Sequence, residues 1–207
     1  MELHSDSFDD GAAIPGDFGF GVPDGTGHMA FGGNRNPHLG WSGAPAGTRS
    51  FAVLCHDRDV PTRSDDVNRD GRVVPADLPR ADFIHWVLVD IPATVSEIGS
   101  GAFSSAVVAR GKEGSGPFGR QGANDYTGWF AGDPDMSGSY LGYDGPCPPW
   151  NDSIPHHYTF TVLALDTERL DVGGAFTADD ARAAAEGHVL AEASIVGVYS
   201  LNPNVPA

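Results

Sequence analysis

The sequence has few cysteines and no long apolar run, and each shortage argues against a class of protein. Cys55 and Cys147 are the only cysteines among 207 residues, too few for a disulfide framework, so we expect reduced thiols in a cytoplasmic protein. No segment approaches the roughly 18 apolar residues that a membrane-spanning helix needs. Residues 1–10 have no basic start and no apolar core, so we expect neither secretion nor stable membrane insertion.

Positive charge is also scarce. The chain has 12 Lys and Arg residues against 28 Asp and Glu residues, and Lys112 is its one lysine. The formal net charge of −16 repels nucleic acid and anionic lipid at long range, so no nucleic-acid partner is expected. The sequence also lacks a Gly-x-Ser-x-Gly motif, which argues against a serine hydrolase.

Glycine and proline, in contrast, are plentiful. The chain has 28 glycines and 16 prolines, which predict many turns and loops. We expect one domain over residues 1–207, because a chain of this length buries a substantial core without being divided. Residues 1–35 show little periodicity and are predicted to be its loop-rich first segment.

Three apolar segments rich in β-branched and aromatic residues predict core strands, at 50–55, 83–91 and 158–166. Thr177 is placed to cap a helix over residues 178–186. After it, residues 188–199 fit either more helix or a closing strand. The predicted fold is mainly β, an antiparallel β-sandwich with one or two peripheral helices near the C-terminus.

Four parts of the chain resemble the phosphatidylethanolamine-binding protein family, in the bacterial branch often labelled Raf kinase inhibitor-like. They are NPHLGWSGAPAGTRSFAVLCHDRDVP (36–61), FIHWVLVDIPA (83–93), GYDGPCPP (142–149) followed by HHYTFTVLALD (156–166), and GHVLAEASIVGVY (187–199). Because they occur in the family's order, together they are more specific than any one of them. The resemblance implies the family's fold, with a small anion-binding pocket.

The resemblance also implies which residues make the pocket. The five that match the family's binding positions are Asp57, His85, Gly145, His156 and Tyr158, with Asp59, Pro61 and Pro146 as supporting neighbours. The family's Asp-Pro-Asp-Ala-Pro motif stands here as DRDVP (57–61), which keeps both carboxylates and the last proline.

The residues themselves support the same choice. Alternate side chains of a strand share a face, so His156 and Tyr158 point one way and His157 points the other. Two imidazoles, a phenol and the free N–H of a Gly-Pro turn suit a phosphate or carboxylate anion. The Asp57 carboxylate would favour a protonated imidazole. Any one histidine alone, however, is more commonly a hydrogen-bonded core residue.

Two insertions, 62–81 and 133–140, distinguish the chain from the shortest family members. The first matches a calcium-binding loop at positions one, three, five and six, through Asp66, Asn68, Asp70 and Gly71. Position twelve is Asp77, where such loops usually have Glu. No flanking helices are evident, and an acidic surface turn is the alternative interpretation. No cofactor is expected unless this loop binds calcium.

The leading functional hypothesis is a binding module for small anionic ligands, either phosphate esters or phospholipid headgroups. No catalytic motif is evident, so no enzyme activity is expected. The alternative takes His85, His156 and Asp57 as the two-histidine-one-carboxylate metal site of an enzyme. Regulation of a protein partner such as a kinase is known in the wider family, but neither that partner nor a homodimer leaves a signature in this sequence.

Overall fold

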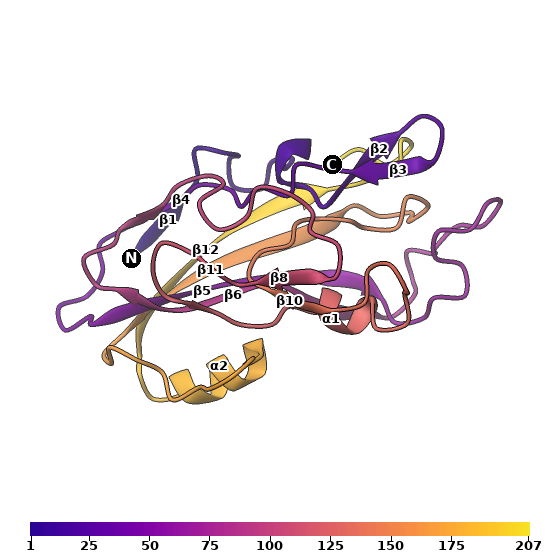
Figure 1. The fold of residues 1–207 in the computed structure, drawn as a ribbon. Helices are drawn as coiled ribbons and strands as arrows, with labels where there is room; N and C mark the ends of the chain where they lie inside the picture. Colours follow the sequence, from indigo (N-terminus) through magenta and orange to yellow (C-terminus); the bar gives the residue numbers. More distant parts are fainter.

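The computed structural model describes residues 1–207, and its centre is a five-stranded sheet (Figure 1). The strand order is β12-β11-β5-β6-β9, and every neighbouring pair is antiparallel. The strands are β5 (Ser50–Pro61), β6 (Arg80–Pro92), β9 (Arg120–Gln121), β11 (His156–Leu165) and β12 (Val189–Tyr199). The three predicted core strands are β11, β5 and β6, at the middle of this sheet, so that prediction is confirmed.

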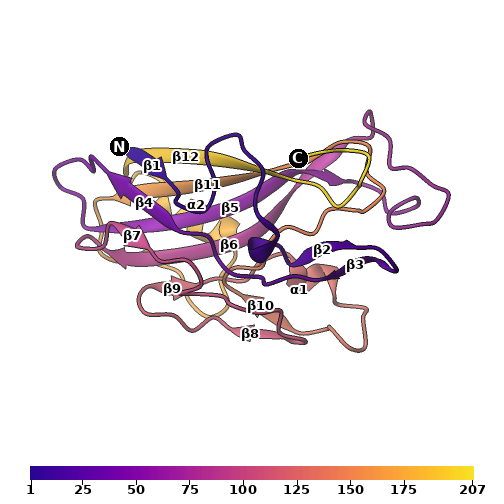
Figure 2. The same ribbon diagram turned by 90° about the horizontal axis from the view of Figure 1, so that it is seen from above.

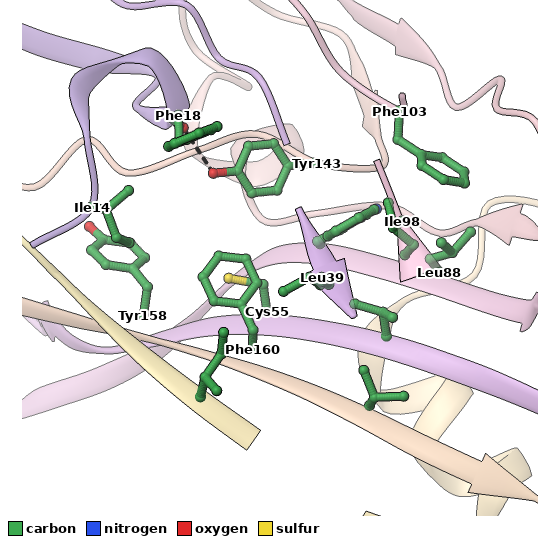
Figure 3. Close-up of a cluster of buried hydrophobic side chains, with 14 of the residues drawn as sticks. Ile14, Phe18, Leu39, Cys55, Leu88, Ile98, Phe103, Tyr143, Tyr158 and Phe160 are labelled. Atoms are coloured by element: carbon green, nitrogen blue, oxygen red, sulfur yellow. Dashed lines mark hydrogen bonds between the residues drawn. The ribbon is translucent and has the colours of Figure 1, made fainter. Parts of the chain in front are cut away.

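A smaller sheet forms the second layer of the sandwich. Its order is β1-β4-β7, with β1 at Glu2–His4, β4 at Leu39–Ser42 and β7 at Glu97–Ile98. The main buried cluster unites Leu39 and Ile98 of this sheet with Leu88 and Phe160 of the large one (Figure 3). Burial of these apolar side chains between the two layers is the main force that holds the layers together.

One helix covers the other face of the large sheet. This helix, α2 (Ala178–Ala185), buries three alanines against a second apolar cluster. Thr177 caps it, because its hydroxyl accepts the N–H of Asp180 while the Asp180 carboxylate accepts the N–H of Thr177, the reciprocal pair of a capping box. The predicted helix is thus confirmed, and the open alternative after it resolves as the strand β12.

The remaining elements are short and lie mostly at one end of the molecule. They are η1 (Gly16–Phe18), β2 (Gly21–Asp24), β3 (His28–Phe31), β8 (Gly111–Glu113), α1 (Tyr126–Trp129) and β10 (Ser139–Leu141). Figure 2 shows β2, β3 and α1 at the end away from the N-terminus. The β8–β10 pair is parallel, a local exception to the predicted antiparallel pattern.

Two further features bear on the sequence predictions. No helix is both long and apolar enough to cross a bilayer. Cys55 is buried and Cys147 half-buried, and both are free thiols. Burial raises the pKa of Cys147 to about 12, so its thiol stays protonated and unreactive near neutral pH.

Candidate functional site

A cavity of about 300 Å³ lies where β3 and α1 approach the ends of β5, β6 and β11. Of its 21 lining residues 12 are hydrophobic, and none is lysine or arginine. Besides Tyr158, the aromatic part of the wall consists of Phe20, Phe31, Phe83, Tyr126, Trp129 and Phe130. An apolar cavity with a few polar groups is the usual form of a small-molecule site.

Four of the five predicted pocket residues line this cavity: Asp57, His85, His156 and Tyr158. Each of the four is almost fully buried. Strand pairing brings them together, since Tyr158 of β11 lies opposite Asp57 of β5, and directly opposite residues share a face of the sheet. His85 comes from β6, the next strand along.

Gly145 is the exception. Its N–H is not free, because it donates to the side-chain oxygen of Asn34 at 2.8 Å. A Cβ at Gly145 would lie 1.9 Å from the carbonyl oxygen of Phe18, so this glycine permits close packing and does not line the cavity. Pro146 also acts through its backbone, because its carbonyl accepts the N–H of Phe20. The expected free donor of the Gly-Pro turn is therefore absent.

His156 is held between two carboxylates. Its Nδ1 lies 2.6 Å from Asp57 Oδ2 and its Nε2 lies 3.1 Å from Asp152 Oδ2. Asp152 in turn accepts two hydrogen bonds from Arg80, at 2.6 and 3.0 Å. Burial alone would lower the pKa of His156, but the bonds to Asp152 and Asp57 outweigh it and raise the pKa to about 9. The four charges alternate in sign and sum to zero.

His85 is different, because it is uncharged at neutral pH. Its Nδ1 lies 2.7 Å from the Asp144 carbonyl oxygen, which can only accept, so Nδ1 carries the proton. Burial lowers the pKa of His85, and the opposing charge of Asp57 does not make up for it. The expectation that Asp57 favours a protonated imidazole holds for His156 but is wrong for His85. The neutral ring has its lone pair on Nε2.

Tyr158 has a hydroxyl with no partner. The ring lies edge-on to His85, with centroids 5.0 Å apart, and the buried hydroxyl makes no hydrogen bond. Burial, the negative charge of Asp57 and the closeness of its carboxylate to the hydroxyl raise the pKa of Tyr158, so the phenol keeps its proton as a donor. The approach of Asp57 does not have the geometry of a hydrogen bond. An unsatisfied buried hydroxyl costs about 1–3 kcal/mol. An acceptor bound in the cavity would recover that cost.

The supporting residues flank this arrangement. The N–H of Asp59 donates to Asp57 Oδ1 at 2.8 Å, which helps to fix the carboxylate that faces His156. His157 points away from the cavity and pairs with Asp59 at 2.8 Å on the half-exposed side of the sheet. The predicted alternation along β11 is thus confirmed. Pro61 lines the cavity.

Sequence reasoning missed two members of the charged network, Asp152 and Arg80. Asp152 stands four residues before His156 in an irregular segment, where no periodicity indicates which way a side chain points. Arg80 begins β6 at the end of the first insertion. The unusual number of aromatic residues in 126–130 was the one available signal for the cavity wall.

The geometry does not support the alternative metal site at Asp57, His85 and His156. A metal needs an imidazole lone pair, but both ring nitrogens of His156 face carboxylates and both carry protons below pH 9. His85 is not part of a three-ligand cluster with these residues.

The predicted calcium loop is an irregular turn region. Its carboxylates at Asp66, Asp70 and Asp77 do not gather within 4.8 Å of one another. The side-chain oxygen of Asn68 accepts the N–H of Trp150 at 3.0 Å. Calcium binding here therefore stays a prediction from the spacing of the sequence.

Comparison with known proteins gives concordant matches. A family model described as phosphatidylethanolamine-binding protein matches residues 4–200. UPF0098 protein YbhB of Escherichia coli (strain K12) is 34% identical over 201 residues, which cover 97% of this chain and 100% of YbhB. UPF0098 protein YbcL of the same organism is 38% identical over 141 residues, 68% of this chain and 58% of YbcL. The crystal structure of E. coli YbcL, called a new member of the mammalian PEBP family, matches with a TM-score of 0.68 and 31% identity, covering 96% of this chain and 97% of that one.

Proposed function

The chain belongs to the phosphatidylethanolamine-binding protein family, and from that premise we propose that its cavity binds small anionic ligands, phosphate esters or phospholipid headgroups. The observation that supports this most is the buried hydroxyl of Tyr158, which makes no hydrogen bond within the protein. A bound acceptor would remove the energetic penalty of leaving this donor unsatisfied. Sulfate-like or phosphate-like oxygens accept such bonds strongly.

Anion binding in this cavity requires a proton. His85 presents a lone pair at Nε2, so an anionic oxygen meets a donor there only after that nitrogen is protonated or if the ligand carries its own hydroxyl. The charged network of Arg80, Asp152, His156 and Asp57 has no net charge and repels an anion only weakly. Binding therefore strengthens as pH falls from 8 towards 6, through proton uptake at His85 or on the ligand.

The apolar wall favours a ligand with an apolar body. Phe83 and Tyr126 lie edge to face with centroids 5.2 Å apart, and Trp129 stands 53% exposed at the rim. Such rings bind hydrocarbon or aromatic groups and leave the polar end of the ligand to Tyr158 and His85. A phosphate ester is thus expected to bind more tightly than phosphate alone.

Calorimetric titration with phenyl phosphate, glycerophosphoethanolamine and inorganic phosphate tests this proposal. Tyr158→Phe is expected to weaken binding of both esters by roughly tenfold, the size of one charge-assisted hydrogen bond. His157→Ala, on the opposite face, is the matched control and should bind as the wild type does. Tighter binding of glycerophosphoethanolamine than of phenyl phosphate would indicate that the cavity prefers phospholipid headgroups to other phosphate esters.

The proposal fails if none of the three probes binds, or if Tyr158→Phe binds them as tightly as the wild type. It assigns no enzyme activity. Regulation of a protein partner and a cytoplasmic location with reduced thiols are further proposals, which rest on the family and on the cysteine content.

A further inference from the structure

Three potential metal ligands gather at the other end of the molecule from the cavity. They are His4, Asp6 and His38, and one ligand atom from each lies within 4.8 Å of the others. Figures 1 and 2 both show β1 and β4 near the N-terminus, well separated from β2, β3 and α1 beside the cavity. These three residues have no role in the proposed binding of anions.

The pairing of the small sheet explains why they meet. His4 of β1 lies opposite Gly40 of β4, and Gly40 lies opposite Glu97 of β7. Residues in such a row share one face, so His4 and Glu97 flank a position that has no side chain. A Cβ at Gly40 would lie 2.5 Å from Cε1 of His4 and 3.2 Å from Cε1 of His38. The glycine therefore leaves the room in which the two imidazoles approach each other.

The backbone around His38 is held firmly. The Ser5 hydroxyl donates to the His38 carbonyl at 2.5 Å, and the His38 N–H donates to the Ser7 hydroxyl at 2.9 Å. The His38 side chain is 15% exposed, whereas those of Asp6 and Glu97 are 80% and 75% exposed. One fixed imidazole is thus surrounded by carboxylates that are free to move.

The distances fit a site that closes around an ion. Asp6 Oδ2 lies 3.9 Å from His38 Nδ1, too long for a hydrogen bond. Glu97 Oε2 lies 3.9 Å from the other ring nitrogen, Nε2, and is not one of the three clustered ligands. Tetrahedral zinc with bonds of about 2.0–2.1 Å holds its ligand atoms about 3.4 Å apart. Small rotations of exposed side chains reach that spacing.

We propose that His4, Asp6 and His38 bind one divalent transition-metal ion, zinc by the chemistry of the ligands, with water in the fourth position, and that the ion ties the end of β1 to the start of β4. Two neutral imidazoles and one carboxylate form an anionic set that suits Zn²⁺, and the net charge of −16 attracts a dication. No thiolate is near, so a soft ion such as Cu⁺ is not favoured.

Binding of the ion would break one hydrogen bond of the protein. His38 Nδ1 accepts the N–H of Asp6 at 3.0 Å, so this lone pair is already in use. A neutral imidazole has one lone pair, and the ring therefore exchanges the bond to the Asp6 N–H for the bond to the metal. The affinity is expected to be micromolar for this reason, and the amide resonance of Asp6 should shift when zinc binds.

The direct test is a titration of untagged, chelator-treated protein with zinc. Calorimetry measures the binding, and the melting temperature measures its effect on stability. Wild type should bind one zinc ion per chain and melt at a higher temperature with zinc, by mass action. His4→Ala removes an exposed ligand with little effect on folding, and should weaken binding at least tenfold. The matched control is His188→Ala, because His188 is also exposed and also lies close to a carboxylate, 2.7 Å from Asp166. This variant should bind zinc as the wild type does.

A second variant tests the geometry without removing a ligand. Gly40→Ala places a methyl group against both imidazoles and should weaken zinc binding several-fold. With Co²⁺ as the probe, wild type should give the intense visible absorption of a four-coordinate ion, and His4→Ala should not. Equal zinc affinity in wild type and His4→Ala, or no binding by the wild type at millimolar zinc, would overturn the proposal.

Discussion

The two faces of β11 carry neighbouring histidines that each pair with an aspartate, but in opposite surroundings. His156 is fully buried between Asp57 and Asp152, whereas the side chain of His157 is 47% exposed beside Asp59. Water screens the outer pair, so it contributes little to stability. The inner pair has lost its water, and its energy depends on all the charges around it.

Within the buried face, the partners of a histidine decide its charge, because two rings buried to the same degree differ in theirs. On the inner face His156 keeps its proton because two carboxylates surround it, and His85 loses its proton because it has only a backbone carbonyl. The two rings, on strands separated by β5, therefore present opposite chemistry to one cavity.

The largest expected effect comes from removing the buried ring. His156→Ala would leave Asp57 and Asp152 buried without the cation between them, at a cost of about 3–5 kcal/mol in the free energy of unfolding. His157→Ala should cost at most about 1 kcal/mol. Urea denaturation followed by circular dichroism measures both. Equal losses in the two variants would remove the distinction between the faces.

The second effect concerns pH. The folded-state pKa of His156 is raised to about 9 from an unfolded value near 6.5, so the stability it provides is complete below pH 6.5 and lost as pH rises towards 9. The loss should be on the order of 3 kcal/mol. Because the pKa of His85 is lowered, His85 has the opposite effect and reduces stability as pH falls below 6.5.

Unfolding free energies between pH 5 and pH 9.5 test this balance. Wild type should be most stable near pH 6.5 and lose stability on the alkaline side. His156→Gln should lack the alkaline loss, whereas His157→Ala should retain it. An alkaline loss that persists in His156→Gln would show that another group is responsible.

A smaller effect separates two buried tyrosines. The Tyr143 hydroxyl donates to the Phe18 carbonyl at 2.8 Å (Figure 3), whereas the Tyr158 hydroxyl has no partner. Tyr143→Phe leaves a buried carbonyl unsatisfied and should cost about 1–3 kcal/mol. Tyr158→Phe should be neutral or slightly stabilising. A comparable loss from Tyr158→Phe in thermal denaturation would mean that its hydroxyl already has a partner.

The sequence predicts the three middle strands of the large sheet well because each of them carries its own apolar pattern. β5, β6 and β11 are rich in valine, leucine and phenylalanine over many residues, and burial on the sheet requires that composition. β12 is ambiguous because Ala191, Glu192 and Ala193 suit a helix equally well. The parallel pair of β8 and β10 has no local signal, since its partners are brought together only by the folded chain.

The candidate site is predictable to the extent that strand alternation applies. Alternation places His156, Tyr158 and His157 on the correct faces, but it says nothing of Gly145, whose N–H is used by Asn34 from a distant loop. The protonation state of His85 was equally inaccessible, because it depends on burial and on the Asp144 carbonyl. Long-range contacts set these properties.

The most direct test of this account is the number of protons taken up when phenyl phosphate binds at pH 8, measured by calorimetry in two buffers of different ionisation enthalpy. At that pH both His85 and the ligand are unprotonated, so binding should take up roughly one proton per ligand. His85→Gln should bind more weakly with little proton uptake, and His157→Ala should match the wild type. Wild-type binding without proton uptake, at an affinity that does not change between pH 6 and pH 8, would contradict the account.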